Sequence, residues 1–321
     1  METALSADFA LIKAWKADRL GNLVFHKTAA NFNVPMCKAA RKSIVEVEEI
    51  VDVGHLDPNQ IDVPSIYVHI FYQGEYFEKP IANLHLQQQD SCDHQSSKKL
   101  TVRDRIAKRA ARELDIGSYV NLGVGIPLLV TGHISPDQHI IFHSENGIIG
   151  MGSYPANREQ ADPDLINAGK EPIMALPGAA IFASDESFAI IRGGHLQVTI
   201  LGAMQVSQYG DLANWTIPGK LVMGMGGAMD LVSSHVSGTK VLVTTEHNTK
   251  SGEPKIVTQC DYPLTGPKCV DMIITEKAVF RVHPEHGLTL LELASGETVE
   301  SIVRSTGAEF KVSPNLRTIP E

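Results

Sequence analysis

A single carboxylate stands at the end of an apolar run near the middle of the chain. In the segment IIFHSENGIIG, residues 140–150, Glu145 follows the apolar run directly, and Asn146 and Gly147 come next. Asn-Gly is a strong hairpin signal, so a polar turn explains these residues on their own. The alternative is chemical, because a glutamate held at a strand tip can act as a base, a metal ligand or a nucleophile. As a nucleophile it would be ionised at neutral pH, given a reference pKa of about 4.3. It would attack an acyl group to form an anhydride, which a thiolate could convert to a thioester.

A glycine-rich segment, KLVMGMGGAMDLV at residues 220–232, is the second candidate. Gly224, Gly226 and Gly227 precede an apolar run that favours a helix. Such a loop can present backbone N–H groups to a phosphate or an oxyanion. It is not a P-loop, since no Gly-Lys-Ser/Thr follows, and Met229 stands where a dinucleotide fingerprint needs its third glycine. A flexible turn before a helix remains the alternative.

Other motifs carry weaker signals. NLGVGIP, residues 121–127, is typical of a tight turn between a strand and a helix, with ligand contact as the alternative. Lys170 follows a glycine and could be an ordinary surface residue. In HPEH, residues 283–286, the proline prevents the helical facing of two histidines that a zinc site uses, so we expect a loop. Cys260 and Cys269 do not have metal-type spacing, and no metal site is predicted.

The elements that would position these residues alternate between short apolar strands and helices, which predicts an α/β fold with mostly parallel sheets. A strand is expected at residues 9–14. Thr101, with Asp104 three residues later, favours a capped helix whose apolar positions are Val102, Ile106, Ala110 and Leu114. The segment GETVESIVRSTG predicts a last helix that ends before Gly307.

Composition limits the function classes. The chain has 321 residues, 43% of them hydrophobic and 20% charged, and its net charge of −9 argues against non-specific nucleic-acid binding. No apolar run approaches the roughly 20 residues that span a bilayer. Four scattered cysteines favour a reducing compartment. The first residues match neither a signal peptide nor a transit peptide.

The chain divides at a polar stretch, residues 86–100, into a first part of residues 1–85 and a second of residues 101–321. A weak internal repeat crosses this boundary. Residues 11–23 align without gaps on residues 200–212, with few identities. A genuine repeat would mean two related α/β parts, and chance similarity is the alternative.

Three motifs in one order and spacing, FHSENGIIG, DLINAGK and GMGGAMDLVSS, resemble those of the family I coenzyme A transferases. SDESFAIIRGGH and ITEKAVF extend the resemblance. It implies that residues 101–321 form a complete β-type half of this family. Residues 1–85 resemble the end of the α-type half, and the family's two halves share one fold.

The resemblance implies a specific chemistry, the transfer of CoA from succinyl-CoA to acetoacetate in ketone-body breakdown. Glu145 matches the catalytic glutamate, which carries CoA as a glutamyl thioester in a ping-pong cycle. Gly226 and Gly227 match oxyanion-binding glycines, and Lys170 and Asn146 are expected near the bound CoA. No metal or organic cofactor is implied, because CoA is a substrate. The family further implies a homodimer in the mitochondrial matrix, without nucleic-acid or membrane partners.

One departure from the family pattern is expected to matter. The α-type half of the family begins well before the counterpart of residue 7, and that upstream region contributes an oxyanion-hole asparagine. Loss of one such donor can lower the rate on the order of 100-fold or more. The alternative expectation is therefore a truncated, catalytically impaired form that folds partly or pairs with a full-length subunit. A nicotinamide-dependent enzyme is a third hypothesis, which the glycine pattern disfavours.

Overall fold

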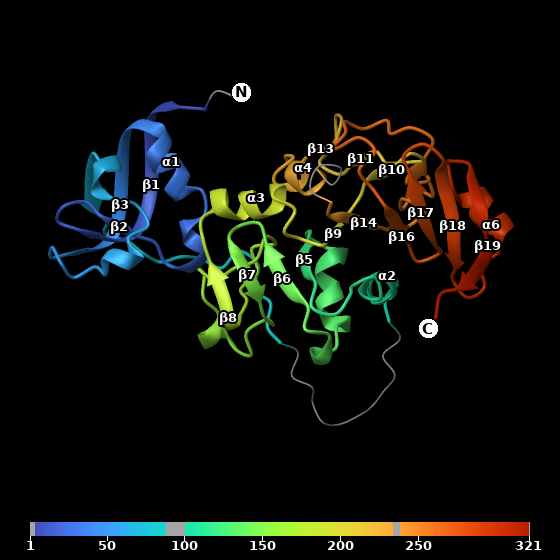
Figure 1. Cartoon of the computed structure of the whole chain (residues 1–321), viewed down its shortest axis with the longest axis horizontal. Helices are drawn as coiled ribbons and strands as arrows, with labels where there is room; N and C mark the ends of the chain where they lie inside the picture. Colours follow the sequence, from blue (N-terminus) through green and yellow to red (C-terminus); the bar gives the residue numbers. More distant parts are fainter. Residues whose placement is uncertain (1–3, 88–99, 234–237, 321) are drawn as a thin grey trace. The chain divides into compact units, whose positions relative to one another are not determined.

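The computed structural model describes residues 4–87, 100–233 and 238–320, and it consists of two compact units (Figure 1). Unit 1 contains residues 1–90 and 143–189, and unit 2 contains residues 91–142 and 190–321. The predicted polar stretch 86–100 lies outside the described residues, apart from residues 86, 87 and 100.

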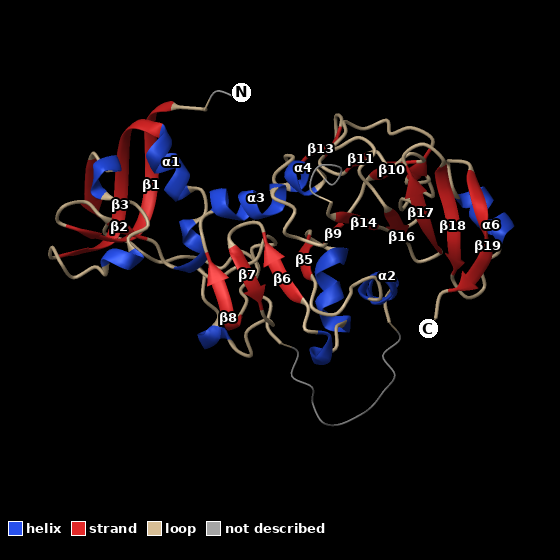
Figure 2. Ribbon diagram, viewed as in Figure 1, coloured by secondary structure: helices blue, strands red, loops and turns tan. Residues whose placement is uncertain are grey.

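Unit 1 contains a four-stranded sheet in the order β2-β1-β3-β4, with parallel pairing of β1 to β3 and of β3 to β4. The strand expected at residues 9–14 is confirmed and is longer. Side chains alternate along it, so Ala10, Ile12 and Ala14 are buried while Phe9 and Leu11 are exposed. The helix α1 packs on β1 (Figure 2). The elements are β1 (Ala7–Asp18), β2 (Leu23–Val24), β3 (Ala40–Val51), β4 (Ile70–Gln73), α1 (Asn33–Ala39), η1 (Lys27–Ala30), η2 (Pro58–Gln60) and η3 (Ser65–Tyr67).

The rest of unit 1 is an antiparallel meander, β6-β7-β8, followed by the start of α3. The strand β6 begins in unit 2 and ends in unit 1, and α3 begins in unit 1 and ends in unit 2. The elements are β6 (Ile141–Ser144), β7 (Ile148–Met151), β8 (Ala175–Ile181), η6 (Arg158–Gln160) and α3 (Ser184–Arg192).

Unit 2 is built on a sheet in the order β19-β18-β17-β16-β14-β9-β5, whose members β5, β9, β14 and β16 are parallel. Two smaller sheets, β11-β10-β15 and β12-β13, lie in the same unit. The strands are β5 (Tyr119–Leu122), β9 (Val198–Leu201), β10 (Gln205–Ser207), β11 (Leu212–Ala213), β12 (Thr216–Ile217), β13 (Leu221–Val222), β14 (Lys240–Thr244), β15 (Ile256–Val257), β16 (Met272–Ile274), β17 (Ala278–His283), β18 (Gly287–Leu293) and β19 (Phe310–Thr318). The helices are α2 (Val102–Ala111), η4 (Ile126–His133), η5 (Pro136–Gln138), α4 (Ala228–Leu231) and α6 (Val299–Ser305). The predicted α/β fold is confirmed.

The start of the first predicted helix and the end of the last one are confirmed. Thr101 caps α2 and forms the expected capping box with Asp104. Of the predicted apolar face, Ile106 and Ala110 are fully buried, whereas Val102, the first helical residue, is 40% exposed. The prediction that Leu114 belongs to this helical face was wrong, because α2 ends at Ala111 and Leu114 is buried beyond the helix. The helix α6 ends at Ser305, before Gly307, as predicted.

The internal repeat is confirmed by strand register. In the ungapped alignment Ala17 corresponds to Val206, and Leu23 corresponds to Leu212. Ala17 lies opposite Leu23 in the β1–β2 pair, and Val206 lies opposite Leu212 in the β10–β11 pair. Two antiparallel pairs with the same register residue for residue mark a structural repeat.

The two turns of the repeat have matching hydrogen bonds between their first and last residues. The carboxylate belongs to the first residue in one turn and to the last residue in the other. Asp18 Oδ1 accepts from the Asn22 backbone N at 2.9 Å, and Asn22 Nδ2 donates to Asp18 Oδ2 at 2.8 Å. At the matching positions, Ser207 Oγ accepts from the Asp211 N at 3.0 Å and donates to Asp211 Oδ2 at 2.8 Å. The carboxylate therefore stands at the first position of one turn and at the last position of the other.

No helix in the described part of the chain combines the length and the apolar character needed to span a bilayer.

Candidate active site

Glu145 lies on a three-residue turn that joins β6 to β7 in unit 1. Ser144 pairs with Ile148 across the turn, and the Gly147 N–H donates to the Ser144 carbonyl at 3.0 Å. The strand and turn expected from the sequence are therefore present. Short antiparallel strands leave the turn residues little conformational freedom, so the position of the Glu145 backbone is well defined.

Gly147 is required by the shape of this turn. Its φ of +115° is unfavourable for residues with a Cβ, and a Cβ built on Gly147 would lie 2.0 Å from the carbonyl oxygen of Phe182. The Phe182 N–H in turn donates to the Gly147 carbonyl at 3.0 Å. The turn is thus held closely against the chain that leaves β8.

The two neighbours of Glu145 are held by one loop, residues 162–171. Ser144 Oγ accepts from the Ala168 N–H at 2.9 Å. Asn146 Nδ2 donates to the Ile166 carbonyl at 2.7 Å, and its Oδ1 is buried without a hydrogen-bond partner among the described residues. Asn146 therefore ties the turn to this loop through its amide nitrogen.

The Glu145 carboxyl is partly buried, and burial raises its pKa above the ordinary value for glutamate. A carboxylate with less hydration has a weaker shell of water to lose when it attacks an acyl carbon. The partial burial of the Glu145 carboxyl therefore favours a role as nucleophile over that of a solvated surface residue.

His143, two residues before Glu145, is fully buried and contacts Ser187 Oγ through Nε2 at 2.9 Å. Burial lowers its pKa to about 4, so the imidazole is neutral at physiological pH. It supplies packing and hydrogen bonding to β6, without a positive charge beside the carboxylate.

Lys170 lies in the same loop that holds the turn. It is exposed, has a positive φ of +60°, and donates its backbone N–H to the Asn167 carbonyl at 2.9 Å. The structure therefore brings the segments of Glu145, Asn146 and Lys170 together within unit 1.

Gly226 and Gly227 belong to unit 2. Gly226 is exposed with a φ of +55°, and Gly227 is the residue that precedes α4. The helix predicted after the glycines is confirmed but has only four described residues. The roles expected for these glycines stay predictions.

The two weaker motifs, NLGVGIP and HPEH, form the turn and the loop that the sequence predicted. Gly125, with a φ of +92°, separates β5 from η4, and Pro127 is in the first turn of η4. In HPEH the N–H groups of Glu285 and His286 donate to His283 Nδ1 at 3.1 and 3.2 Å, which closes a tight loop. Both motifs form turns in the structure.

Sequence reasoning missed two residues that hold this loop, Thr28 and Asp164. Thr28 Oγ donates to the Asp164 carbonyl at 2.6 Å and accepts from the Ile166 N–H at 3.2 Å. The triplet Asp162-Pro163-Asp164, whose last residue is the first residue of DLINAGK, is a local turn signal. The partner, however, stands 136 residues earlier, where nothing in the sequence indicates it.

Comparison with known proteins identifies the family. The family model described as coenzyme A transferase matches residues 1–73 and 103–305.

The chain belongs to the coenzyme A transferase family.

Curated relatives agree with this assignment. The chain is 57% identical over all its 321 residues to human succinyl-CoA:3-ketoacid coenzyme A transferase 2, mitochondrial, and covers 61% of that protein. It is 51% identical over 211 residues, 66% of its length, to one subunit of the Helicobacter pylori succinyl-CoA:3-ketoacid coenzyme A transferase, and covers 99% of that subunit. The chain thus spans about three fifths of the animal relatives that it matches.

Solved structures of coenzyme A transferases share the fold. An acyl-CoA transferase of Escherichia coli O157:H7 superposes with a TM-score of 0.75 at 23% identity, over 98% of this chain and 62% of that one. Glutaconate coenzyme A-transferase of Acidaminococcus fermentans gives a TM-score of 0.53 at 18% identity, over 70% of this chain and 91% of that one.

Proposed function

We propose that the protein transfers CoA from succinyl-CoA to a 3-oxo acid, acetoacetate being the expected acceptor, through a glutamyl-CoA thioester on Glu145. The observation that carries this proposal is a partly buried carboxylate on a turn whose two flanking residues are both hydrogen-bonded to one loop. The names of the relatives support the choice of substrates.

The first half-reaction begins when the Glu145 carboxylate attacks the thioester carbonyl of succinyl-CoA. The C–S bond breaks, CoA leaves as a thiolate, and a mixed anhydride forms. The thiolate then attacks the glutamyl carbonyl of that anhydride, so succinate leaves and CoA remains bound to Glu145 as a thioester. No proton or electron is gained or lost in this sequence.

The second half-reaction reverses these steps with the acceptor. The acetoacetate carboxylate attacks the glutamyl carbonyl, which releases CoA thiolate and forms a second anhydride. The thiolate attacks the acetoacetyl carbonyl, which yields acetoacetyl-CoA and the free Glu145 carboxylate. Water must be excluded, because both the anhydride and the thioester hydrolyse.

Other groups have supporting roles in this proposal. Gly226 and Gly227 would donate backbone N–H groups to the oxyanion, and Lys170 would lie near the bound CoA. Asn146 would lie near the bound CoA. The reaction needs no metal or organic cofactor, and we extend to this protein the mitochondrial location in the human relative's name. We also propose that the protein forms a homodimer.

A covalent-adduct experiment tests the proposal. The protein that carries this chain is mixed with acetoacetyl-CoA and quenched, and the peptide containing Glu145 is analysed by mass spectrometry. We expect a CoA adduct on Glu145 that is absent in Glu145→Gln and present in Glu49→Gln, a surface control. An adduct that persists in Glu145→Gln, or no adduct in the wild type, would contradict the proposed nucleophile.

A further inference from the structure

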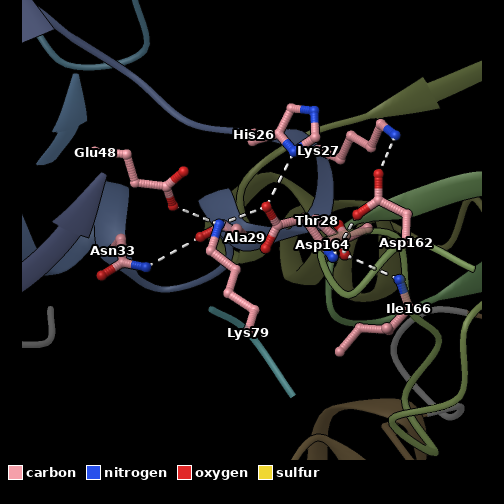
Figure 3. Close-up of polar contacts among 10 residues, drawn as sticks. All are labelled: His26, Lys27, Thr28, Ala29, Asn33, Glu48, Lys79, Asp162, Asp164 and Ile166. Carbon is pink, nitrogen blue, oxygen red and sulfur yellow. Dashed lines mark hydrogen bonds and ion pairs between the residues drawn. The ribbon is translucent and has the colours of Figure 1, made fainter. Parts of the chain in front are cut away.

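The carboxylate of Asp164 is the centre of an ion-pair cluster in unit 1 (Figure 3). Asp164 Oδ2 lies 3.0 Å from His26 Nδ1 and 2.6 Å from Lys79 Nζ. The Asp164 side chain is only 10% exposed. Lys79 also pairs with Glu48 Oε1 at 2.7 Å. Three segments of unit 1 that are far apart in the sequence therefore converge on one buried carboxylate.

The backbone of Asp164 is also held, by hydrogen bonds from Thr28. The Asp164 carbonyl accepts from the Thr28 N–H at 2.8 Å and from Thr28 Oγ at 2.6 Å. The same Thr28 hydroxyl accepts from the Ile166 N–H at 3.2 Å, and Thr28 is buried. One hydroxyl thus holds the two consecutive peptide groups that flank Leu165.

The same loop is hydrogen-bonded to the turn of Glu145. The Ile166 carbonyl accepts from Asn146 Nδ2 at 2.7 Å, and two residues later the Ala168 N–H donates to Ser144 Oγ at 2.9 Å. Hydrogen bonds of 3.2 Å or less within unit 1 therefore connect Thr28 to the loop and the loop to both neighbours of Glu145.

A metal ion is the alternative explanation of this cluster. One ligand atom each from His26, Asp162 and Asp164 lies within 4.8 Å of the others. However, Lys27 forms an ion pair with Asp162, and Lys79 forms one with Asp164. A divalent cation would have to displace both ammonium groups, so the geometry favours an ion-pair network that fixes the loop.

We propose that Thr28 and Asp164 are positioning residues for Glu145, acting through the loop of residues 162–171. This inference rests on the proposed function, since it assigns a role relative to the Glu145 nucleophile. Misplacement of a reacting group by about 1 Å can lower the rate on the order of 100-fold. The loss of the Thr28 hydroxyl should therefore slow acylation of Glu145 without changing the groups that touch the substrate.

The experiment compares two substitutions of Thr28 with a control substitution of another buried threonine. Thr28→Val keeps the shape of the side chain and removes both hydrogen bonds, whereas Thr28→Ser keeps the hydroxyl. Thr239→Val is the control, because Thr239 is also buried and its Oγ1 donates to the Leu196 carbonyl at 2.8 Å in unit 2. The readouts are the rate of CoA-adduct formation on Glu145 after rapid mixing with acetoacetyl-CoA, the dissociation constant for free CoA, and the unfolding midpoint in urea.

The expected pattern separates positioning from stability. Thr28→Val should slow adduct formation on the order of 10- to 100-fold with CoA affinity within about 3-fold of wild type. Thr28→Ser should remain within about 3-fold of wild type. Thr239→Val should lower the unfolding midpoint as Thr28→Val does and leave the adduct rate within about 3-fold.

Three outcomes overturn the inference. The first is a wild-type adduct rate in Thr28→Val, the second is an equal slowing by Thr239→Val, and the third is an equal slowing by Thr28→Ser. If Thr28→Val does not fold, Asp164→Asn replaces it, and an unchanged adduct rate in that variant overturns the inference. Failure of the proposed function gives a different result, because the wild type then forms no adduct on Glu145 at all.

Discussion

Gly147 lies so close to Phe182 that a Cβ on the glycine would stand 2.0 Å from the phenylalanine's carbonyl oxygen. Gly147→Ala must therefore displace either the turn of Glu145 or the chain after β8. We expect a loss of about 2–4 kcal/mol in the free energy of unfolding, from a steric clash together with a strained φ. Urea denaturation measures it.

Gly54→Ala is the matched control for that substitution. Gly54 has a φ of +91°, but its Cβ would meet nothing within 4 Å. It should lose only about 1 kcal/mol, the cost of the backbone conformation alone. Equal losses in the two variants would show that the contact with Phe182 contributes nothing.

The rate of Glu145 acylation should depend on pH in a defined direction. Burial raises the pKa of Glu145, and only the ionised carboxylate attacks. The rate should therefore fall as the pH drops through this raised pKa, at a higher pH than for a solvated glutamate. Single-turnover adduct formation measured against pH tests this, and a flat profile down to the pKa of an exposed glutamate would contradict it.

The same raised pKa predicts a gain in stability in Glu145→Gln. The folded protein holds the Glu145 proton more tightly than the unfolded chain does, so stability declines as the pH rises through this range. At neutral pH the buried charge is a cost that glutamine does not have. Urea denaturation at neutral pH should show a more stable variant, and the difference should shrink when the measurement is repeated in acid.

Two buried histidines should make the fold acid-sensitive. Burial lowers the pKa of His143 and of His247 to about 4. The unfolded chain therefore binds more protons between about pH 6.5 and 4, and stability is lost as the pH falls through that window. Between pH 7 and 5 each histidine should account for about 2 kcal/mol. Comparison of His247→Gln with the exposed control His55→Gln tests this, since only the former should reduce the loss.

The exchanged turn partners of the internal repeat predict a compensated double substitution. Asp18→Ser removes a carboxylate that accepts from Leu20 N at 3.0 Å and from the Asn22 backbone and side chain, and it should cost about 1–3 kcal/mol. Asp18→Ser with Asn22→Asp recreates the Ser207–Asp211 arrangement. It should recover most of the loss, and a double-mutant cycle in urea measures the coupling. Additive losses would mean that the two turns are not equivalent.

The parts of the fold that the sequence predicted are those with a local cause. The cap of α2 needs only Thr101 and Asp104, and the turn at Glu145 needs only Asn146 and Gly147. Both follow from residues within four positions of one another, and both are present in the structure.

The parts that sequence reasoning missed depend on distant partners. Lys79 is an isolated lysine in the sequence, and only the fold places it between Glu48 and Asp164. The repeat was weak in sequence for a related reason. Asp18 and Asn22 match Ser207 and Asp211 in hydrogen bonding but not in residue type, so a comparison position by position records two mismatches.

The contact between Thr28 and Asp164 also sets an order of events during folding. The turn between β6 and β7 closes over three residues, and hairpins of this kind form within microseconds. The loop that holds it depends on two segments 136 residues apart, whose meeting requires closure of a long stretch of chain. Until they meet, we expect Glu145 to remain a solvated carboxylate. In pulse-labelled refolding the Ala168 amide should therefore gain protection later than the Gly147 amide. Glu145, the proposed nucleophile, would then acquire its orientation and its raised pKa at a late step of folding.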